Sequence, residues 1–450
     1  MADALVNPVV PGDMCELSVD ALVSDGRGLG RFRGVAVFVD GALPGQTVRA
    51  RIAAVRKRLA EAELVEVVAP SPDERAAPCP HAGRCGGCPW QALDYGRQLV
   101  WKERIVRDAL ERVAKVPEPP LLPILPSPLA WGYRNKMEFA FGLSEDGERA
   151  IGLRERGSRR IVEVTGCLLQ TPLTMRVLAA ARVLMNGPFR DVEGRFLVVR
   201  EPRAGGCFVE LIAAPGVEAA VGERFAAALR EAAEGVTGVA LSVRAAAGDV
   251  AYGERTLYAD GQLEERIGHI RLRLGHNAFF QVNTPAAELL YAEAERFAAL
   301  DTFDGPVLWD VYGGVGSIGL YMARHAGRVV GIEAMPGAVR CARANARALG
   351  VEGYRVEQGD ARSVLGRLAK VGPKPDVVVV DPPRAGLDAT VVRQLTDAIP
   401  ARLVCVSCNP ATLARDVARL APAYRLAAAR PVDLFPQTPH VETAALLERV

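Results

Sequence analysis

The sequence predicts an α/β protein with three parts: a small OB-like β-barrel at the N-terminus, a central mixed α/β domain, and a doubly wound, Rossmann-like sheet at the C-terminus. Three observations support this prediction. A chain of 450 residues is too long for one ordinary hydrophobic core. Short β-branched runs alternate with glycine turns before residue 70, whereas after residue 300 buried runs alternate with helical segments. We expect the three domains to span residues 1–74, 75–275 and 276–450.

The composition is that of a globular chain. Hydrophobic residues make up 50% and charged residues 24%, with a formal net charge of +2. No apolar run reaches the roughly 18–20 residues that span a bilayer, and no basic residue precedes Arg27, so we expect neither a membrane segment nor a secretory leader. We therefore expect a cytoplasmic protein. Structural disulfides are rare in that compartment, so the nine cysteines need another explanation.

The N-terminal domain has the pattern of a five-stranded barrel of the OB type, a scaffold that binds oligonucleotides. The runs expected as strands are Leu17–Val23, Gly34–Val39, Thr47–Val55 and Ala62–Val67. Between Arg27 and Arg58 there are eight basic residues and one acid, Asp40, which predicts a surface suited to a polyanion, although a solvated charged face would show the same run. Nearby glycines would let the backbone approach a phosphate: Gly26, Gly28 and Gly30. The stretch resembles a TRAM domain, an RNA-binding module.

Three cysteines lie within ten residues, at Cys79, Cys85 and Cys88. One more thiolate would complete a four-cysteine site for zinc or for a [4Fe–4S] cluster, and Cys167 is the best-placed candidate. Two paired Cys-x-x-Cys motifs would favour zinc. Here three ligands are clustered, one is distant, and proline follows cysteine, so we favour the iron–sulfur cluster and keep zinc as the alternative.

The rest of the central domain carries one other notable motif. Residues 90–116 have helical periodicity, and the proline-rich residues 117–128 read as a linker. The following aromatic and basic set, from Trp131 through Tyr133 to Lys136, can stack on a base and hold its phosphate, or can equally form a strand edge with solvated charges. Up to about Leu274 we expect mostly strands and one alanine-rich helix, Ala219–Ala233.

The C-terminal domain opens with the pattern of a nucleotide site. A buried strand contains Asp310 and runs into a glycine loop, Tyr312–Ser317, whose main-chain amides can close on a ligand. A second strand ends in Glu333, placed to accept both ribose hydroxyls, and Asp360 follows a third strand, where an adenine would lie. A dinucleotide is the competing ligand. An acid just before the glycine loop, however, typifies S-adenosylmethionine (SAM) methyltransferases.

Two further strand ends carry reactive side chains. Asp381-Pro-Pro-Arg384 follows the fourth strand, and it lacks the aromatic residue that ends the related motif of amino-group methyltransferases. The apolar run before Cys408 delivers that thiol to the same edge, where it is a candidate nucleophile; a small apolar residue capping a strand would show the same pattern. Glu442 begins the last strand and places a carboxylate near this edge, unless it is an ordinary surface glutamate.

Together these motifs resemble the RNA uracil-C5 methyltransferases, specifically the iron–sulfur, TRAM-bearing branch that acts on 23S ribosomal RNA. Six separate motifs occur in order over nearly the whole chain, including Phe279-Phe-Gln281-Val-Asn283. The resemblance implies that Cys408 is the nucleophile and Glu442 the base. It implies a SAM pocket formed by Gln281, Tyr312, Ser317, Glu333, Asp360 and Asp381. It also implies a [4Fe–4S] site whose ligands are Cys79, Cys85, Cys88 and Cys167. Ser317 departs from the asparagine often found at its position.

The expected reaction is addition of Cys408 to uracil C6, methyl transfer from SAM to C5, removal of the C5 proton by Glu442, and elimination. A stacked base cannot reach the thiol, so we expect the uracil to be flipped out of the RNA. We expect RNA as the partner, with no membrane and no obligate protein partner.

Three alternatives remain open. The tRNA-acting branch, which typically lacks the TRAM domain and the cluster, is the runner-up. A cytosine-C5 enzyme usually has proline before its nucleophile, where this chain has Ser407. A non-catalytic RNA-binding or redox protein would have no need for the pair formed by Cys408 and Glu442.

Overall fold

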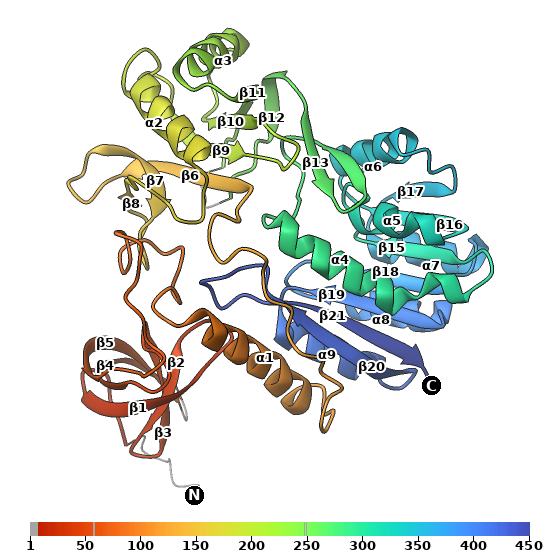
Figure 1. The fold of residues 1–450 in the computed structure, drawn as a ribbon, viewed down its shortest axis with the longest axis horizontal. Coiled ribbons are helices and arrows are strands. Elements are labelled where there is room, and N and C mark those ends of the chain that lie inside the picture. Colours follow the sequence, from red (N-terminus) through yellow and green to blue (C-terminus); the bar gives the residue numbers. More distant parts are fainter. Residues whose placement is uncertain (1–7, 57–58, 247, 249) are drawn as a thin grey trace, which may run out of the picture.

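The computed structural model describes residues 8–56, 59–246, 248 and 250–450. It contains a closed barrel, a central seven-stranded sheet, a two-stranded ribbon and a C-terminal seven-stranded sheet, so the α/β architecture expected from the sequence is confirmed (Figure 1). Within these described ranges no helix is both long and apolar enough to cross a membrane.

The barrel closes in the strand order β1-β2-β3-β5-β4, and its core is lined by alternate residues of each strand. The strands are β1 (Met14–Leu22), β2 (Gly28–Phe32), β3 (Val35–Asp40), β4 (Thr47–Arg56) and β5 (Leu59–Ala69). The interpretation of the glycines as a phosphate-binding turn is wrong for Gly28 and Gly30, which lie inside β2. A Cβ on Gly30 would lie 2.2 Å from the carbonyl oxygen of Ser18, so this glycine allows two strands to pack closely.

The predicted basic surface of the barrel is partly neutralised by acids of the next strand. Arg49 pairs with Glu66 at 2.7 Å, and Arg51 pairs with Glu63 at 2.9 Å. These acids stand on β5, outside the counted run, and antiparallel pairing with β4 brings them opposite the arginines. Lys57 and Arg58, which belong to the run, lie outside the described residues.

The central sheet has the order β12-β11-β10-β9-β6-β7-β8. Its strands are β6 (Lys136–Leu143), β7 (Arg149–Arg154), β8 (Ile161–Val162), β9 (Gly194–Arg200), β10 (Cys207–Ala213), β11 (Val236–Val243) and β12 (Arg255–Asp260). Helices α2 (Pro172–Asn186) and α3 (Ala219–Ala232) cover one face, sharing a core with β6, β9 and β10. The sequence reading missed α2, although Thr171 caps its first turn and Pro172 begins it.

The ribbon of β13 (Leu263–Ile267) and β14 (Ile270–Leu274) leads into the C-terminal sheet, whose order is β17-β16-β15-β18-β19-β21-β20. Its strands are β15 (Val307–Val311), β16 (Arg328–Glu333), β17 (Tyr354–Gln358), β18 (Val377–Val380), β19 (Arg402–Ser407), β20 (Tyr424–Val432) and β21 (Glu442–Arg449). Strand β21 runs antiparallel to both of its neighbours, β19 and β20. Its first residues therefore lie at the edge where the other strands end.

Helices cover both faces of this sheet. One face packs against α4 (Thr284–Ala298), α5 (Ser317–Met322) and α6 (Pro336–Ala348); the other packs against α7 (Ala361–Val371), α8 (Ala389–Ala398), α9 (Pro410–Leu420) and also α1 (Tyr95–Arg112). Helix α1 is shorter than the predicted 90–116, because Asp94 caps its first turn. The C-terminal half of α1 packs on the C-terminal sheet, and its N-terminal half contacts the barrel. Helix α1 therefore joins the barrel to the C-terminal sheet.

Candidate active site

The glycine loop after β15 is organised by a buried acid. Asp310 is 1% exposed, and its Oδ2 accepts a hydrogen bond from the Gly319 amide at 3.0 Å, while Oδ1 has no hydrogen-bond partner among the described residues. Burial raises the pKa of Asp310 to about 7. A Cβ on Gly313 or Gly319 would lie within 2.7 Å of this carboxylate, so the loop needs glycine at both places. The buried carboxylate of Asp310 therefore fixes the conformation of the glycine loop.

The glycines also satisfy a Gly-x-Gly-x-x-Gly spacing at Gly314, Gly316 and Gly319. Glycine spacing by itself therefore does not separate a dinucleotide site from a SAM site. Glu333, at the end of β16, lies beside the same loop: its two carboxylate oxygens accept from the amides of Gly314 at 3.0 Å and Met335 at 2.7 Å.

The other expected cofactor residues surround this loop unevenly. The Ser317 hydroxyl lies 3.0 Å from the hydroxyl of Tyr291, a buried residue of α4 that sequence reasoning missed. Tyr312 has a φ of 66°, a left-handed conformation that is rare for a tyrosine. Asp360 caps α7, is exposed and pairs with Arg362, which lowers its pKa.

Gln281 is 5% exposed and lies just before α4. Its backbone oxygen accepts a hydrogen bond at 3.0 Å from the side chain of Asn135, which also reaches Thr284 at 2.7 Å. Asn135 thus ties the start of the central sheet to this part of the pocket.

Three reactive residues meet at the carboxyl edge of the sheet. The pairing of β19 with β21 ends at Ser407 and Thr443; Cys408 is the next residue after Ser407, and Glu442 is the residue just before Thr443. Asp381 follows the neighbouring strand β18, and its backbone amide donates a hydrogen bond to the carbonyl oxygen of Val311 at 3.2 Å. The predicted nucleophile, base and aspartate are therefore brought together.

Burial sets the protonation of this group. It raises the pKa of Glu442 to about 8 and that of Asp381 to about 7, with a smaller contribution from a neighbouring acid in each case. Burial, followed by the charges of Glu442 and Asp381, raises the pKa of Cys408 to about 11, while Arg384 acts in the opposite direction. Glu442 is 3% exposed, so the alternative of a surface glutamate is wrong.

The backbone around Arg384 is held by the start of α9. Its carbonyl oxygen accepts hydrogen bonds from Asn409 at 3.3 Å and Thr412 at 3.4 Å. His440 lies close to this arginine: burial, followed by the charge of Arg384, lowers the pKa of His440 to about 4. The imidazole is therefore neutral near pH 7, and its ring packs edge-on against Phe435.

One aromatic residue of the motif in the central domain, Tyr133, is not available to stack on a base. Tyr133 is 4% exposed, and its hydroxyl donates to the carbonyl oxygen of Pro436 at 3.0 Å. A buried ring cannot stack on a nucleic-acid base. The sequence pattern did not indicate this contact, because the residue that accepts the hydrogen bond of Tyr133 lies 303 positions away.

The four predicted cysteine ligands line one cavity of about 430 Å³, together with Trp131 and Arg134. Burial, followed by the neighbouring thiols, raises the pKa of Cys88 to about 12; burial also raises the pKa of Cys85 and Cys167. Among the residues that the structure describes, no three His, Cys, Asp or Glu side chains approach closely enough to hold a single metal ion.

Comparison with known proteins identifies both ends of the chain. The model of the tRNA (uracil-5-)-methyltransferase family matches residues 367–450, and that of the TRAM domain matches residues 8–65. A protein of Nitratidesulfovibrio vulgaris described as an uncharacterized RNA methyltransferase is 48% identical, over 97% of this chain and 96% of its own. A similarly described protein of Gloeobacter violaceus is 38% identical, over 98% of this chain and 99% of its own.

Among solved structures, the tRNA (uracil-54, C5)-methyltransferase of Pyrococcus abyssi, in complex with S-adenosyl-L-homocysteine, superimposes with a TM-score of 0.76 and 27% identity. The match covers 96% of this chain and 100% of that one. The glycine loop, the acids at the strand ends and these relatives agree with one another. The chain therefore belongs to the SAM-dependent RNA methyltransferases of the uracil-C5 family that carry an N-terminal TRAM domain.

Proposed function

We propose that this protein makes 5-methyluridine in RNA, with Cys408 as the nucleophile and Glu442 as the general base. The observation that carries the proposal is the meeting of Cys408, Glu442 and Asp381 at one sheet edge. Cys408 directly follows β19, Glu442 begins the adjacent strand β21, and the charges of Glu442 and Asp381 both act on the thiol. The family model matched over this region and the Pyrococcus abyssi enzyme are both named for uracil C5, which supports the choice of base and atom.

The chemistry uses each residue once. The sulfur of Cys408 bonds to uracil C6, and the ring electrons move to O4 to form an enolate, which makes C5 nucleophilic. Bound SAM supplies the methyl group that C5 accepts. The carboxylate of Glu442 then takes the proton from C5, the electrons of the C5–H bond restore the C5–C6 double bond, and the sulfur leaves as thiolate. The product is 5-methyluridine.

The pKa values suit this order of events. A glutamate with a pKa of about 8 is a far better proton acceptor than one with its usual pKa, yet it can still ionise near neutral pH. Burial raises the pKa of Cys408 to about 11, so the thiol is protonated before attack and must lose its proton as it adds to C6; the charge of Arg384 partly opposes this rise and so favours the thiolate. Asp381, which lies beside both groups, is placed to hydrogen-bond the edge of the base.

We assign the SAM pocket to the residues around the glycine loop. The carboxylate of Glu333 is in reach of a ribose beside the loop amides, and Tyr312, held in its left-handed conformation, presents its ring near Asp360. Ser317 is oriented by Tyr291, and Gln281 closes the side next to α4. Such a pocket binds SAM by main-chain amides and two acids.

The thiol-lined cavity fits a [4Fe–4S] cluster better than zinc. Four thiolates on one zinc at about 2.3 Å would bring the sulfurs to within about 3.8 Å of one another. In this structure the thiols instead stand around a cavity of about 430 Å³, which suits a wider group. Cys79, Cys85, Cys88 and Cys167 would hold it, and it would tie the loop at 79–88 to the central domain without taking part in methyl transfer.

The RNA substrate is the finer question. The cysteine motif favours large-subunit ribosomal RNA, and we propose 23S rRNA as the substrate. The match to the Pyrococcus abyssi tRNA enzyme over 96% of this chain favours tRNA as the second candidate, because that match leaves no extra domain to mark an rRNA enzyme.

The test combines both questions. Purified protein is incubated with SAM and either 23S rRNA or total tRNA, each free of 5-methyluridine, and the nucleosides are identified by mass. We expect 5-methyluridine in rRNA with wild type and none with Cys408→Ala. Glu442→Gln should accumulate a methylated protein–RNA adduct, because the C5 proton is retained. Product in tRNA alone would transfer the assignment to tRNA, and 5-methylcytidine or full activity of Cys408→Ala would refute the proposal.

A further inference from the structure

The segment that leads into Glu442 is irregular but buried. Residues 433–441, which join β20 to β21 and are called here the catalytic segment, form no helix or strand. Asp433 and Leu434 are 0% exposed and Gln437 is 3% exposed. Glu442 is the first residue of β21, so the strand ladder holds it on one side only. Its orientation therefore depends on what holds the catalytic segment.

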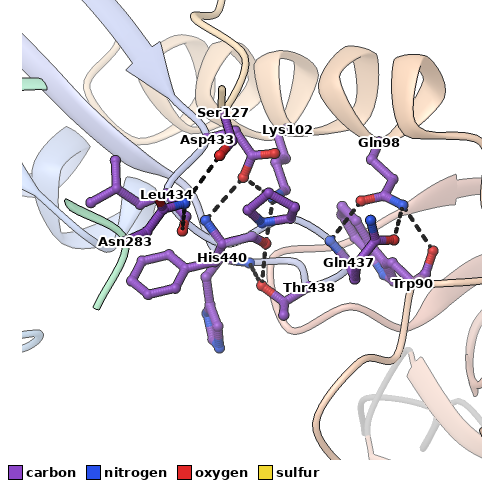
Figure 2. Close-up of polar contacts among 12 residues, drawn as sticks. Trp90, Gln98, Lys102, Ser127, Asn283, Asp433, Leu434, Gln437, Thr438 and His440 are labelled. Carbon is purple, nitrogen blue, oxygen red and sulfur yellow. Dashed lines mark hydrogen bonds and ion pairs between the residues drawn. The ribbon is translucent and has the colours of Figure 1, made fainter. Parts of the chain in front are cut away.

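Four consecutive carbonyl groups of this segment accept hydrogen bonds from donors elsewhere in the chain. The pairs are Leu434 with Asn283 at 2.9 Å, Phe435 with Lys102 at 2.9 Å, Pro436 with Tyr133 at 3.0 Å, and Gln437 with the amide of Trp90 at 3.0 Å. Figure 2 shows three of these donors, with α1 behind the segment. Buried carbonyls need partners, and here each partner comes from a separate part of the sequence.

Helix α1 holds the catalytic segment through two side chains on one of its faces. Gln98 and Lys102 stand four residues apart, so their side chains lie next to each other on the helix. The Gln98 amide donates to the side-chain oxygen of Gln437 at 2.8 Å and accepts from its backbone amide at 2.9 Å (Figure 2). This pair holds Gln437 at a φ of 71°, a conformation that persists only where the surroundings enforce it.

The second anchor is a buried ion pair. Lys102 lies 2.5 Å from Asp433, and both side chains are 0% exposed. Burial lowers the pKa of Lys102, and Asp433 opposes this shift. A buried pair of this kind adds little to stability compared with a well-packed apolar pair. What it does provide is a fixed direction, since the same ammonium group also donates to Phe435.

Trp90 links the catalytic segment to the barrel and to the cysteine loop at 79–88. It is 1% exposed, its indole nitrogen donates to Gly26 of the barrel at 3.1 Å, and its carbonyl oxygen accepts from Gln98 at 3.1 Å. It also follows Cys88 by two positions. The barrel, the cysteine loop and α1 therefore all meet at the catalytic segment.

We propose that Trp90, Gln98, Lys102 and Tyr133 are positioning residues that hold the catalytic segment so that Glu442 points at C5 of the methylated base. The inference rests on the proposed function, in which Glu442 acts only after methyl transfer. Loosening the segment should then slow proton removal and leave the earlier attack by Cys408 unchanged, because Cys408 belongs to the separately anchored β19–α9 turn.

The chain offers a matched pair of single-atom deletions. Tyr133→Phe removes the hydroxyl that donates to Pro436, and Tyr424→Phe removes one that donates to Pro400 at 3.1 Å. The two tyrosines are 4% and 2% exposed. Tyr424 begins β20 and Val432 ends it, so the control lies at the opposite end of the sheet from the catalytic segment. Both variants should lose similar stability.

The experiment is a rapid-quench single turnover with methyl-labelled SAM and the RNA on which wild type is active. Denaturing gels separate the methylated adduct from released methylated RNA. We expect Tyr133→Phe to lengthen the lifetime of the adduct about fivefold, the ratio that corresponds to one hydrogen bond of about 1 kcal/mol. Its rate of methyl transfer should match wild type, and Tyr424→Phe should change neither rate. Gln98→Met, which loses the paired amide, should lengthen the lifetime further.

Glu442→Gln separates the two possible failures. If Glu442→Gln forms no methylated adduct, the proposed function is wrong. If it forms the adduct but Tyr133→Phe and Gln98→Met keep the wild-type adduct lifetime, the positioning inference is wrong. If Tyr133→Phe and Tyr424→Phe both slow methyl transfer and adduct release alike, the effect is a loss of stability, and the positioning inference is wrong.

Discussion

At the scale of single residues, the site is built from acids whose pKa values burial raises to near neutral pH. Asp310, Asp381 and Glu442 all have raised pKa values, of about 7, 7 and 8, and burial is the first cause in each case. Three carboxyl groups in one buried region cannot all ionise cheaply. Ionising these buried acids lowers the stability of the folded protein, so their effect can be tested by measuring stability at different pH values.

Glu442→Gln should stabilise the protein at alkaline pH. The folded state keeps the Glu442 proton up to a pKa of about 8, whereas the unfolded chain loses it near its ordinary pKa, so the contribution of this group to stability falls as pH rises between those values. Glutamine removes that fall. We expect the melting temperature of Glu442→Gln to exceed that of wild type at pH 9 by a few degrees, about 2–4 °C per kcal/mol, and to be nearly equal at pH 5.

Glu111→Gln is the matched control, because Glu111 is exposed on α1. Differential scanning calorimetry at the two pH values gives the comparison. An equal shift in both variants, or destabilisation of Glu442→Gln at pH 9, would contradict the burial of an ionisable Glu442.

At the scale of elements, close approach and edge alignment decide the architecture. The parallel strands β15, β16 and β18 end at one edge, and the single antiparallel strand β21 begins there, which is how a residue eight positions from the C-terminus reaches the site. In the barrel, close approach depends on Gly30 of β2, because the carbonyl oxygen of Ser18 in β1 lies where a side chain of residue 30 would stand.

Gly30→Ala should therefore destabilise the barrel. Its Cβ would lie 2.2 Å from the Ser18 carbonyl oxygen, and backbone cannot move aside as a side-chain tip can. We expect a loss of about 1–3 kcal/mol, the usual cost of overpacking, seen as a lower melting transition by circular dichroism. Gly337→Ala in α6 is the control, since the nearest atom to its Cβ is a guanidinium nitrogen of Arg340 at 3.8 Å. Equal melting of both variants would argue against tight packing at Gly30.

At the scale of the whole molecule, the cysteine loop and the active site are connected through short segments rather than through a shared core. The loop at 79–88 faces the central sheet across the thiol-lined cavity, and Trp90 immediately beyond it contacts both the barrel and the catalytic segment. What fills the cavity therefore bears on how firmly Trp90 is held.

Anaerobically purified protein should be brown and contain close to four irons per chain, with broad absorbance near ~400 nm. Cys167→Ser should lose the colour and most of the iron, because it removes the one proposed ligand that lies outside the loop at 79–88. Cys341→Ser, at a half-buried cysteine that does not line the cavity, should keep both. A colourless wild-type protein with one zinc would show that the assignment to iron–sulfur is wrong.

The sequence by itself predicted the class of each domain and placed acidic and thiol side chains at the strand ends. Periodicity, the glycine loop and the residues after each strand are local signals, and they led to the α/β sheet, the barrel and the residues Asp381, Cys408 and Glu442. Local patterns report local structure because backbone conformation depends mainly on near neighbours.

Only the tertiary structure decided which charges are neutralised and what holds the catalytic segment. The arginines of β4 meet acids of β5 through strand pairing, Tyr133 is covered by Pro436, and α1 joins the barrel to the C-terminal sheet. Each of these contacts joins residues far apart in the chain or in separate elements. Such partners are selected by the packing of whole elements, since burial requires every polar group to find a partner wherever the fold places one.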